Sequence, residues 1–178
     1  MAENYFGEGV AARYDESAAD LFAPAVIDPV VDFLADLAGQ GAALELGIGT
    51  GRIALPLAKR GVRVQGIDLS AAMVAKLRAK PGARAIGVTI GDFATTTVEG
   101  AFSVAYLVFN TIMNLTTQDE QIACFQNVAA QLEPGGCFVI ERWAFRDFSG
   151  SHPARPFGRS TSVPRGSGST STTSSRRG

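Results

Sequence analysis

The sequence predicts a doubly wound α/β fold, in which a mostly parallel sheet carries helices on both faces. Short apolar runs alternate with segments of helical periodicity from about residue 24 to residue 141. This alternation is typical of parallel sheets, because the connection between two parallel strands is usually a helix. A glycine cluster follows the first apolar run, and an aspartate ends the second. Since such folds bind ligands at the carboxyl ends of their strands, we expect the binding site there.

The first three elements are predicted from hydrophobic spacing and from residues that end helices. Residues 26–37 have apolar side chains at helical spacing, and aspartates four residues apart give this helix a polar face. Residues 42–46 form a short apolar run that leads into the glycine cluster, which indicates a strand. Residues 53–59 are apolar and basic and stop at Arg60-Gly61, a usual helix end.

The next strand and helix are bounded by residues with clear local preferences. The apolar run at residues 62–67 indicates a strand. Ser70 can cap a helix that runs to about residue 79. Pro81-Gly82 then closes this helix.

The remaining elements are three strands and one helix. Residues 85–90, 102–108 and 137–140 are rich in β-branched or aromatic side chains, which favours strands. Residues 118–132 form a helical segment. The Glu-Pro-Gly-Gly run at residues 133–136 indicates a helix stop and a turn.

Composition excludes several protein classes. The chain has 178 residues, of which 46% are hydrophobic, so it suits one ordinary domain and lacks the signature of disorder. No apolar run is long enough for a membrane span, and the amino end lacks the pattern of a secretion signal. Cys124 and Cys137 lie too far apart for a CxxC motif, so we expect no disulfide framework, no metal site and a cytoplasmic location.

Charge and composition change after residue 148. Residues 1–148 contain 11 Lys and Arg and all 17 Asp and Glu, whereas residues 149–178 contain five Arg and no acid. The last segment is dominated by Ser, Thr, Gly and Pro, and it cannot bury enough apolar surface to offset the entropy of ordering. We therefore predict a helical cap (residues 1–40), a cofactor-binding domain (residues 41–148) and a disordered tail, with no nucleic-acid or membrane partner.

The strongest functional signal is the segment LELGIGTGR at residues 44–52. Gly47, Gly49 and Gly51 follow the strand at every second position, where the backbone must turn tightly and a ligand must approach without interference from a Cβ atom. Asp68 ends the second strand, where nucleoside-binding folds place a carboxylate that accepts both ribose hydroxyls. The alternatives are an ordinary turn and an acid that only balances a helix dipole.

Two classes of enzyme combine a glycine loop after the first strand with an acid at the end of the second. Residues 49–54 fit the dinucleotide pattern G-x-G-x-x-A, so an NAD(P)-dependent oxidoreductase is one alternative. Glu45 before the loop favours another class, because a carboxylate attracts an ammonium group and repels a pyrophosphate. A non-catalytic fragment that only binds a cofactor is a third possibility.

An acid followed by three alternating glycines resembles the first motif of class I S-adenosylmethionine-dependent methyltransferases, which have a Rossmann-like fold. Further matches follow in the family's order: Gly91-Asp92-Phe93 after the third strand, Phe109-Asn110 after the fourth, and Leu132-Glu133-Pro134-Gly135-Gly136 before the fifth. The resemblance covers about residues 10–141. It implies a methyltransferase whose cofactor is S-adenosylmethionine.

The resemblance also implies which residues bind this cofactor. They are Tyr14, Glu45, Gly47, Gly49, Gly51, Asp68, Leu69, Asp92, Phe93, Phe109 and Asn110. The acid before the loop and the first glycine would hold the amino-acid end of the cofactor, and Asp68 its ribose. Asp92 and Phe93 would contact the adenine, while the residues after the fourth strand line the floor near the reactive methyl. Tyr14 either folds over the cofactor or packs as a helix aromatic.

No catalytic residue is predicted. A sulfonium is an excellent leaving group, so the protein mainly supplies proximity and a dry site. A nitrogen or carbon nucleophile then needs no strong base. His152, the single histidine, lies in the polar tail. We expect a small-molecule acceptor, whose identity the sequence does not specify.

The chain departs from the family pattern after about residue 141. Family members continue past the fifth strand with a helix and an antiparallel hairpin, whereas here a segment biased to Ser, Arg, Gly and Pro follows. GC-rich codons read out of frame yield such a composition. We therefore expect that a single-base shift near codon 141 truncated a longer methyltransferase and that the product has little activity. Sequencing the gene tests this expectation.

Overall fold

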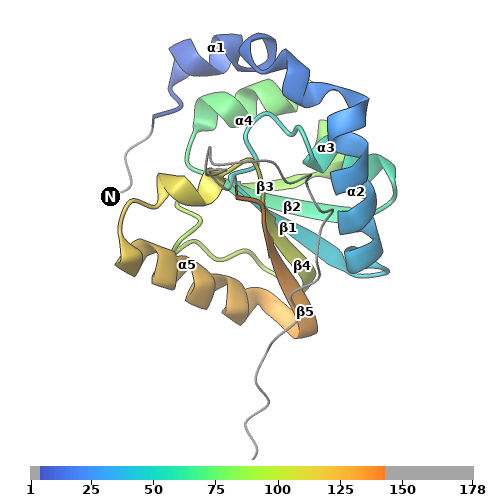
Figure 1. The fold of residues 1–178 in the computed structure, drawn as a ribbon, viewed down its shortest axis with the longest axis vertical. Helices are drawn as coiled ribbons and strands as arrows, with labels where there is room; N and C mark the ends of the chain where they lie inside the picture. Colours follow the sequence, from blue (N-terminus) through green and yellow to red (C-terminus); the bar gives the residue numbers. More distant parts are fainter. Residues whose placement is uncertain (1–4, 143–178) are drawn as a thin grey trace, which may run out of the picture. The chain divides into compact units, whose positions relative to one another are not determined.

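The computed structural model describes residues 5–142, and a parallel sheet forms its centre (Figure 1). Within these residues, five strands lie in the order β3-β2-β1-β4-β5, and neighbouring strands pair in parallel. The strands are β1 (Ala42–Leu46), β2 (Arg63–Asp68), β3 (Gly87–Ile90), β4 (Phe102–Leu107) and β5 (Leu132–Ile140). The strand order reverses between β1 and β4, which is the point where doubly wound folds bind ligands. The predicted fold class is confirmed.

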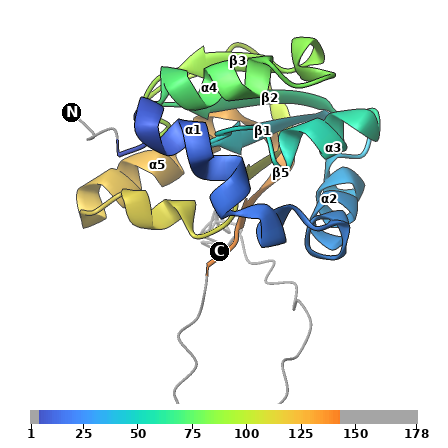
Figure 2. The ribbon, with the colours of Figure 1, turned by 90° about the horizontal axis from the view of Figure 1, so that it is seen from above.

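Helices cover both faces of this sheet (Figure 2). They are α1 (Glu8–Ser17), α2 (Pro24–Ala38), α3 (Ala54–Lys59), α4 (Ala71–Arg78) and α5 (Gln118–Gln131), with short 3-10 helices η1 (Ala19–Phe22), η2 (Ala83–Ala85) and η3 (Thr111–Asn114). α2, α3 and α4 share one apolar cluster with the sheet, and α5 packs into a second cluster on the opposite face. α1 lies beside α4. The helices predicted at residues 26–37, 53–59, 70–79 and 118–132 are therefore confirmed, with small shifts at their ends.

Local signals explain where two of these helices begin. Ser70 precedes α4, and its hydroxyl oxygen accepts a hydrogen bond from the Met73 amide at 3.2 Å. Thr117 precedes α5 and forms a reciprocal capping box with Glu120, in which each side chain accepts from the other residue's backbone amide. Such caps satisfy amides that have no partner within the helix.

The structure corrects the predicted start of the fifth strand. β5 begins at Leu132, so the turn predicted at residues 133–136 lies inside the strand. Leu132 pairs with Phe102 and Cys137 pairs with Val104, so the four residues between them bulge opposite a single residue of β4. The glycines suit this bulge because Gly135 has a φ of +89°.

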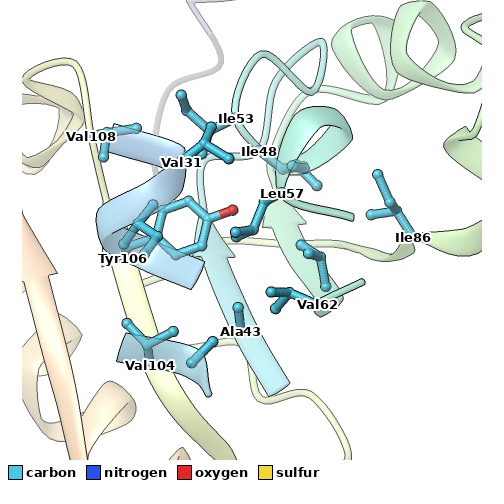
Figure 3. Packing of buried hydrophobic residues seen from close by; sticks show 14 of the residues in the cluster. Val31, Ala43, Ile48, Ile53, Leu57, Val62, Ile86, Val104, Tyr106 and Val108 are labelled. Carbon is cyan, nitrogen blue, oxygen red and sulfur yellow. The ribbon is translucent and has the colours of Figure 1, made fainter. Parts of the chain in front are cut away.

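The larger core lies between the sheet and the helices α2 and α3 (Figure 3). Val31 and Leu57 come from these helices and pack beside the fully buried ring of Tyr106 on β4. Because β4 is buried on both faces, its sequence reads as a nearly continuous apolar run. This rigid strand brings the Tyr106 hydroxyl next to β1, where the functional site begins.

The domain predictions are not tested by the fold. The described residues all belong to one unit, and the division into a cap and a cofactor-binding domain stays a prediction. The predicted tail at residues 149–178, and His152 within it, lie outside the described residues. None of the helices in the described part of the chain is long and apolar enough to cross a membrane.

Candidate functional site

The glycine loop lies at the carboxyl end of β1, beside the switch point. Gly47, Gly49 and Gly51 have φ values of +71°, +54° and +80°, which side chains rarely permit. A Cβ atom on Gly47 would lie 2.8 Å from Cγ2 of Thr111. The amides of Gly47 and Ile48 donate to the Ile67 carbonyl at 2.8 and 3.1 Å, which fixes the loop against β2. The loop therefore presents bare main chain, as the sequence predicts.

Asp68, at the end of β2, connects the loop to the next helix. Its Oδ2 accepts a hydrogen bond from the Gly49 amide at 2.6 Å, and its Oδ1 accepts from the Ser70 amide at 2.8 Å. Burial raises the pKa of this carboxyl, and the two amides act against that rise. Each carboxylate oxygen keeps a second lone pair, so Asp68 can organise the loop and still accept a ligand hydroxyl.

Glu45 lies on β1 and is almost completely buried, with 4% of its surface exposed. The Tyr106 hydroxyl donates to its Oε2 at 2.9 Å. Burial raises the pKa of the Glu45 carboxyl to about 8, although the Tyr106 hydrogen bond and the nearby Arg52 charge act to lower it. A cation that approached this carboxyl would favour its ionised form.

A pocket connects the glycine loop with the amino-terminal segment. It is lined by Phe6, Tyr14, Gly47, Gly49, Asp68, Leu69, Met73, Phe93, Thr111 and Asn114. The structure thus brings six of the predicted residues together around one cavity. The other five do not line it: Glu45, Gly51, Asp92, Phe109 and Asn110.

Four of the lining residues were not predicted. Thr111 and Asn114 lie in η3, directly after the Phe109-Asn110 motif, and Met73 lies in the first turn of α4. Their closeness in sequence to predicted motifs is a signal that could have identified them. Phe6 carries no such signal: it is held in place because its carbonyl accepts from the Ser70 hydroxyl.

The amino-terminal helix is tied to the glycine loop by three polar groups. The Asp15 carboxylate accepts from the Thr50 hydroxyl at 2.6 Å and pairs with the Lys80 ammonium at 2.6 Å. Lys80 also donates to the Thr50 carbonyl at 2.9 Å. Tyr14, next to Asp15, therefore lines the pocket, and its ring contacts that of Phe6 edge-on, with centroids 6.1 Å apart.

The loop after β4 has a strained backbone. Phe109 and Asn110 have φ values of +55° and +64°, unusual for residues with side chains. Glu141, directly after β5, supports both: its Oε2 accepts from the Phe109 amide at 3.0 Å, and its carbonyl accepts from the Asn110 amide at 3.3 Å. Such strain is frequent at functional sites. Among the described residues, no cluster of side chains suits a metal ion.

Comparison with known proteins gives the family. A family described as a methyltransferase domain matches residues 43–136. An uncharacterized methyltransferase of Geobacillus kaustophilus is 36% identical over 136 residues, which are 75% of this chain and 60% of the relative. The cypemycin N-terminal methyltransferase of a Streptomyces species is 34% identical over 98 residues, 55% of this chain and 40% of the relative. The chain therefore spans about half the length of these curated relatives.

Solved structures agree with this match. The CcbJ methyltransferase from Streptomyces caelestis has a TM-score of 0.69 and 41% identity, covering 76% of this chain and 56% of that one. SAM-bound CalS10, an amino pentose methyltransferase from Micromonospora echinaspora, has a TM-score of 0.58 and 28% identity, covering 82% of this chain and 60% of that one. Together with the parallel sheet and the glycine loop at its switch point, these matches show that the chain belongs to the class I S-adenosylmethionine-dependent methyltransferases.

Proposed function

We propose that this protein transfers a methyl group from S-adenosylmethionine to an amine of a small molecule. The observation that carries the proposal is the hydrogen bond of the Gly49 amide to Asp68, which holds bare main chain and a carboxylate side by side on the pocket wall. The family match supports the transfer, and it disfavours the nicotinamide-dependent alternative. CalS10, which is described as an amino pentose methyltransferase, supports a small amine as acceptor.

The residues present fit the methyl donor. A Cβ atom on Gly47 would lie 2.8 Å from Thr111 Cγ2, so glycine is required where the loop meets η3 on the pocket wall. Asp68 would accept the ribose hydroxyls, and the buried ring of Phe93 would contact the adenine together with Leu69. Asp92 is proposed to bind the adenine edge from the adjacent turn, where its Oδ1 accepts from the Ala94 amide at 2.9 Å.

Methyl transfer needs little acid–base chemistry from this chain. When bound, the donor supplies an activated methyl on a sulfonium, and the protein contributes alignment and exclusion of water. Among the residues that line the pocket, Asp68 is the carboxylate, and both of its oxygens already accept backbone amides. No strong general base therefore faces the cavity within the described residues, which favours an amine over a hydroxyl as acceptor.

The donor must displace part of the pocket wall to enter. The cavity holds about 80 Å³, whereas ligand pockets usually hold several hundred. Phe6 and Tyr14 form the part of the wall that the amino-terminal segment contributes. We infer that the segment from Phe6 through α1 moves away when the donor binds and then closes over it.

Calorimetric titration tests this proposal. The protein is expected to bind S-adenosylhomocysteine and not NAD, and Asp68→Asn is expected to weaken that binding by about tenfold through the loss of charged hydrogen bonds. Asp36→Asn, at an exposed position of α2, is the matched control and should leave binding unchanged. Formation of S-adenosylhomocysteine with a panel of small amines measures transfer. Tighter binding of NAD than of S-adenosylhomocysteine contradicts the proposal.

A further inference from the structure

Glu141 lies directly after β5 and joins the ends of two neighbouring strands. Its amide donates to the Leu107 carbonyl at 2.9 Å, which continues the pairing of β5 with β4. Its Oε2 accepts from the Phe109 amide at 3.0 Å, and its carbonyl accepts from the Asn110 amide at 3.3 Å. This one residue therefore bonds to the end of β4 and to both residues of the turn that follows β4.

The turn that Glu141 holds has a backbone that its own residues disfavour. Phe109 and Asn110 are consecutive, and both adopt the left-handed conformation. This conformation costs free energy in any residue with a Cβ atom, and the cost is greater for a bulky phenylalanine than for an asparagine. Such a backbone persists only where the surrounding structure constrains it. The two hydrogen bonds that Glu141 accepts from these amides supply such a constraint.

The side chain of Phe109 is held as well as its amide. The Cζ atom of Arg52, the residue that follows the glycine loop, lies 3.4 Å from the centre of the Phe109 ring. The Arg52 charge also attracts the Glu141 carboxylate. Stacking of a guanidinium on a ring and a hydrogen bond from an amide to a carboxylate both favour a defined geometry. The turn is therefore fixed through its backbone and through its ring.

The residues that follow this turn form part of the pocket wall. Thr111 and Asn114, both in η3, line the cavity. The Thr111 side chain lies close to the glycine loop, since only the absence of a Cβ atom at Gly47 leaves room for its Cγ2 atom. Thr111 directly follows Asn110 in the chain, so the backbone angles of the turn set where Thr111 meets the loop. A change in the turn would therefore move this part of the wall.

We propose that Glu141 is a positioning residue for methyl transfer, which holds the Phe109-Asn110 turn so that η3 keeps its place on the pocket wall. This assignment rests on the proposed function. Glu141 does not itself line the pocket, so it acts through the turn and not by contact with a ligand. Asp68 and Phe93, on which the donor is proposed to bind, follow other strands. Loss of Glu141 should therefore impair the transfer more than the binding of the donor.

Steady-state kinetics and calorimetry test this role. Glu141→Ala should lower kcat for methyl transfer by about tenfold or more, because a displaced wall misaligns the acceptor. Its Kd for S-adenosylhomocysteine should stay within about threefold of the wild-type value. Glu141→Gln keeps an oxygen that accepts from the Phe109 amide, so it should restore most of the lost rate. Glu133→Ala, at an exposed position of β5, is the matched control and should leave kcat unchanged.

Hydrogen exchange followed by mass spectrometry measures the turn itself and needs neither donor nor acceptor. In Glu141→Ala, amides of residues 108–114 should exchange faster than in the wild type, because the turn loses a hydrogen bond and opens more often. Amides of β2 should exchange at the wild-type rate, since Glu141 does not contact this strand. Circular dichroism and thermal melting verify that each variant is folded under the assay conditions.

Four outcomes would overturn the assignment. If exchange at residues 108–114 is unchanged in Glu141→Ala, Glu141 does not hold the turn. If exchange rises but kcat does not fall, the turn is held without any effect on transfer. If kcat and the affinity for S-adenosylhomocysteine fall in the same proportion, the site as a whole is disturbed. If the wild-type protein methylates no amine although the exchange result is as expected, the proposed function fails and the role in transfer fails with it.

Discussion

Replacing Glu45 by glutamine should stabilise the unliganded protein and weaken its binding of the donor. The Glu45 side chain is buried against Tyr106, and burial raises the pKa of its carboxyl from 4.5 to about 8. Glutamine keeps the shape and still accepts a hydrogen bond from the Tyr106 hydroxyl, but it has no charge to desolvate. The variant loses the carboxylate that would attract the donor's ammonium group, so S-adenosylhomocysteine should bind about tenfold more weakly.

The size of the effect on stability follows from the two pKa values. The unfolded carboxyl ionises near 4.5 and the folded carboxyl near 8, so between these values the folded state binds the additional proton. The contribution of Glu45 to stability is therefore complete below pH 4.5 and is lost as the pH rises through 8. At about 1.4 kcal/mol for each pKa unit, the loss amounts to about 4 kcal/mol between pH 5 and pH 9. The glutamine variant lacks this loss.

Urea denaturation at pH 5, 7 and 9 measures the effect. At pH 5, the free energy of unfolding of Glu45→Gln should be slightly higher than that of the wild type. The difference between the two proteins should grow as the pH rises. Glu120→Gln is the matched control, because Glu120 is only partly buried and glutamine preserves a capping box. A variant whose stability declines with pH in parallel with the wild type would refute the reasoning.

Two further predictions concern the amino-terminal helix and α5. Asp15→Asn removes the charge that pairs with Lys80, so α1 should leave the glycine loop more easily. S-adenosylhomocysteine should then dissociate faster in stopped-flow experiments, whereas the melting temperature should change little. An unchanged dissociation rate would show that α1 does not control release. Thr117→Ala removes the hydroxyl that caps α5 and should lower the free energy of unfolding by about 1 kcal/mol. Thr117→Ser keeps a hydroxyl and should leave this free energy unchanged. Equal losses of stability in both variants would exclude the cap as the cause.

The sequence predicts the strands and the loop because each depends on local chemistry. The run at residues 42–46 is apolar and short, and β1 occupies these residues. Glycine permits the left-handed backbone that a tight strand-to-helix turn needs, and Gly47, Gly49 and Gly51 all have positive φ. The start of β5 was not predictable in this way, because the bulge at residues 133–136 depends on pairing with β4, which local preference does not encode.

By itself, then, the amino-acid sequence determined the parallel sheet, its glycine loop and the acid at the end of β2, since hydrophobic spacing and glycine act over a few residues. The tertiary structure alone decided which side chains face one cavity. Phe6 reaches it through a hydrogen bond to Ser70, and Tyr14 through the pairing of its neighbour Asp15 with Lys80. The burial of Glu45 was decided at the same level, because the environment of a charge depends on residues distant in sequence that fold around it.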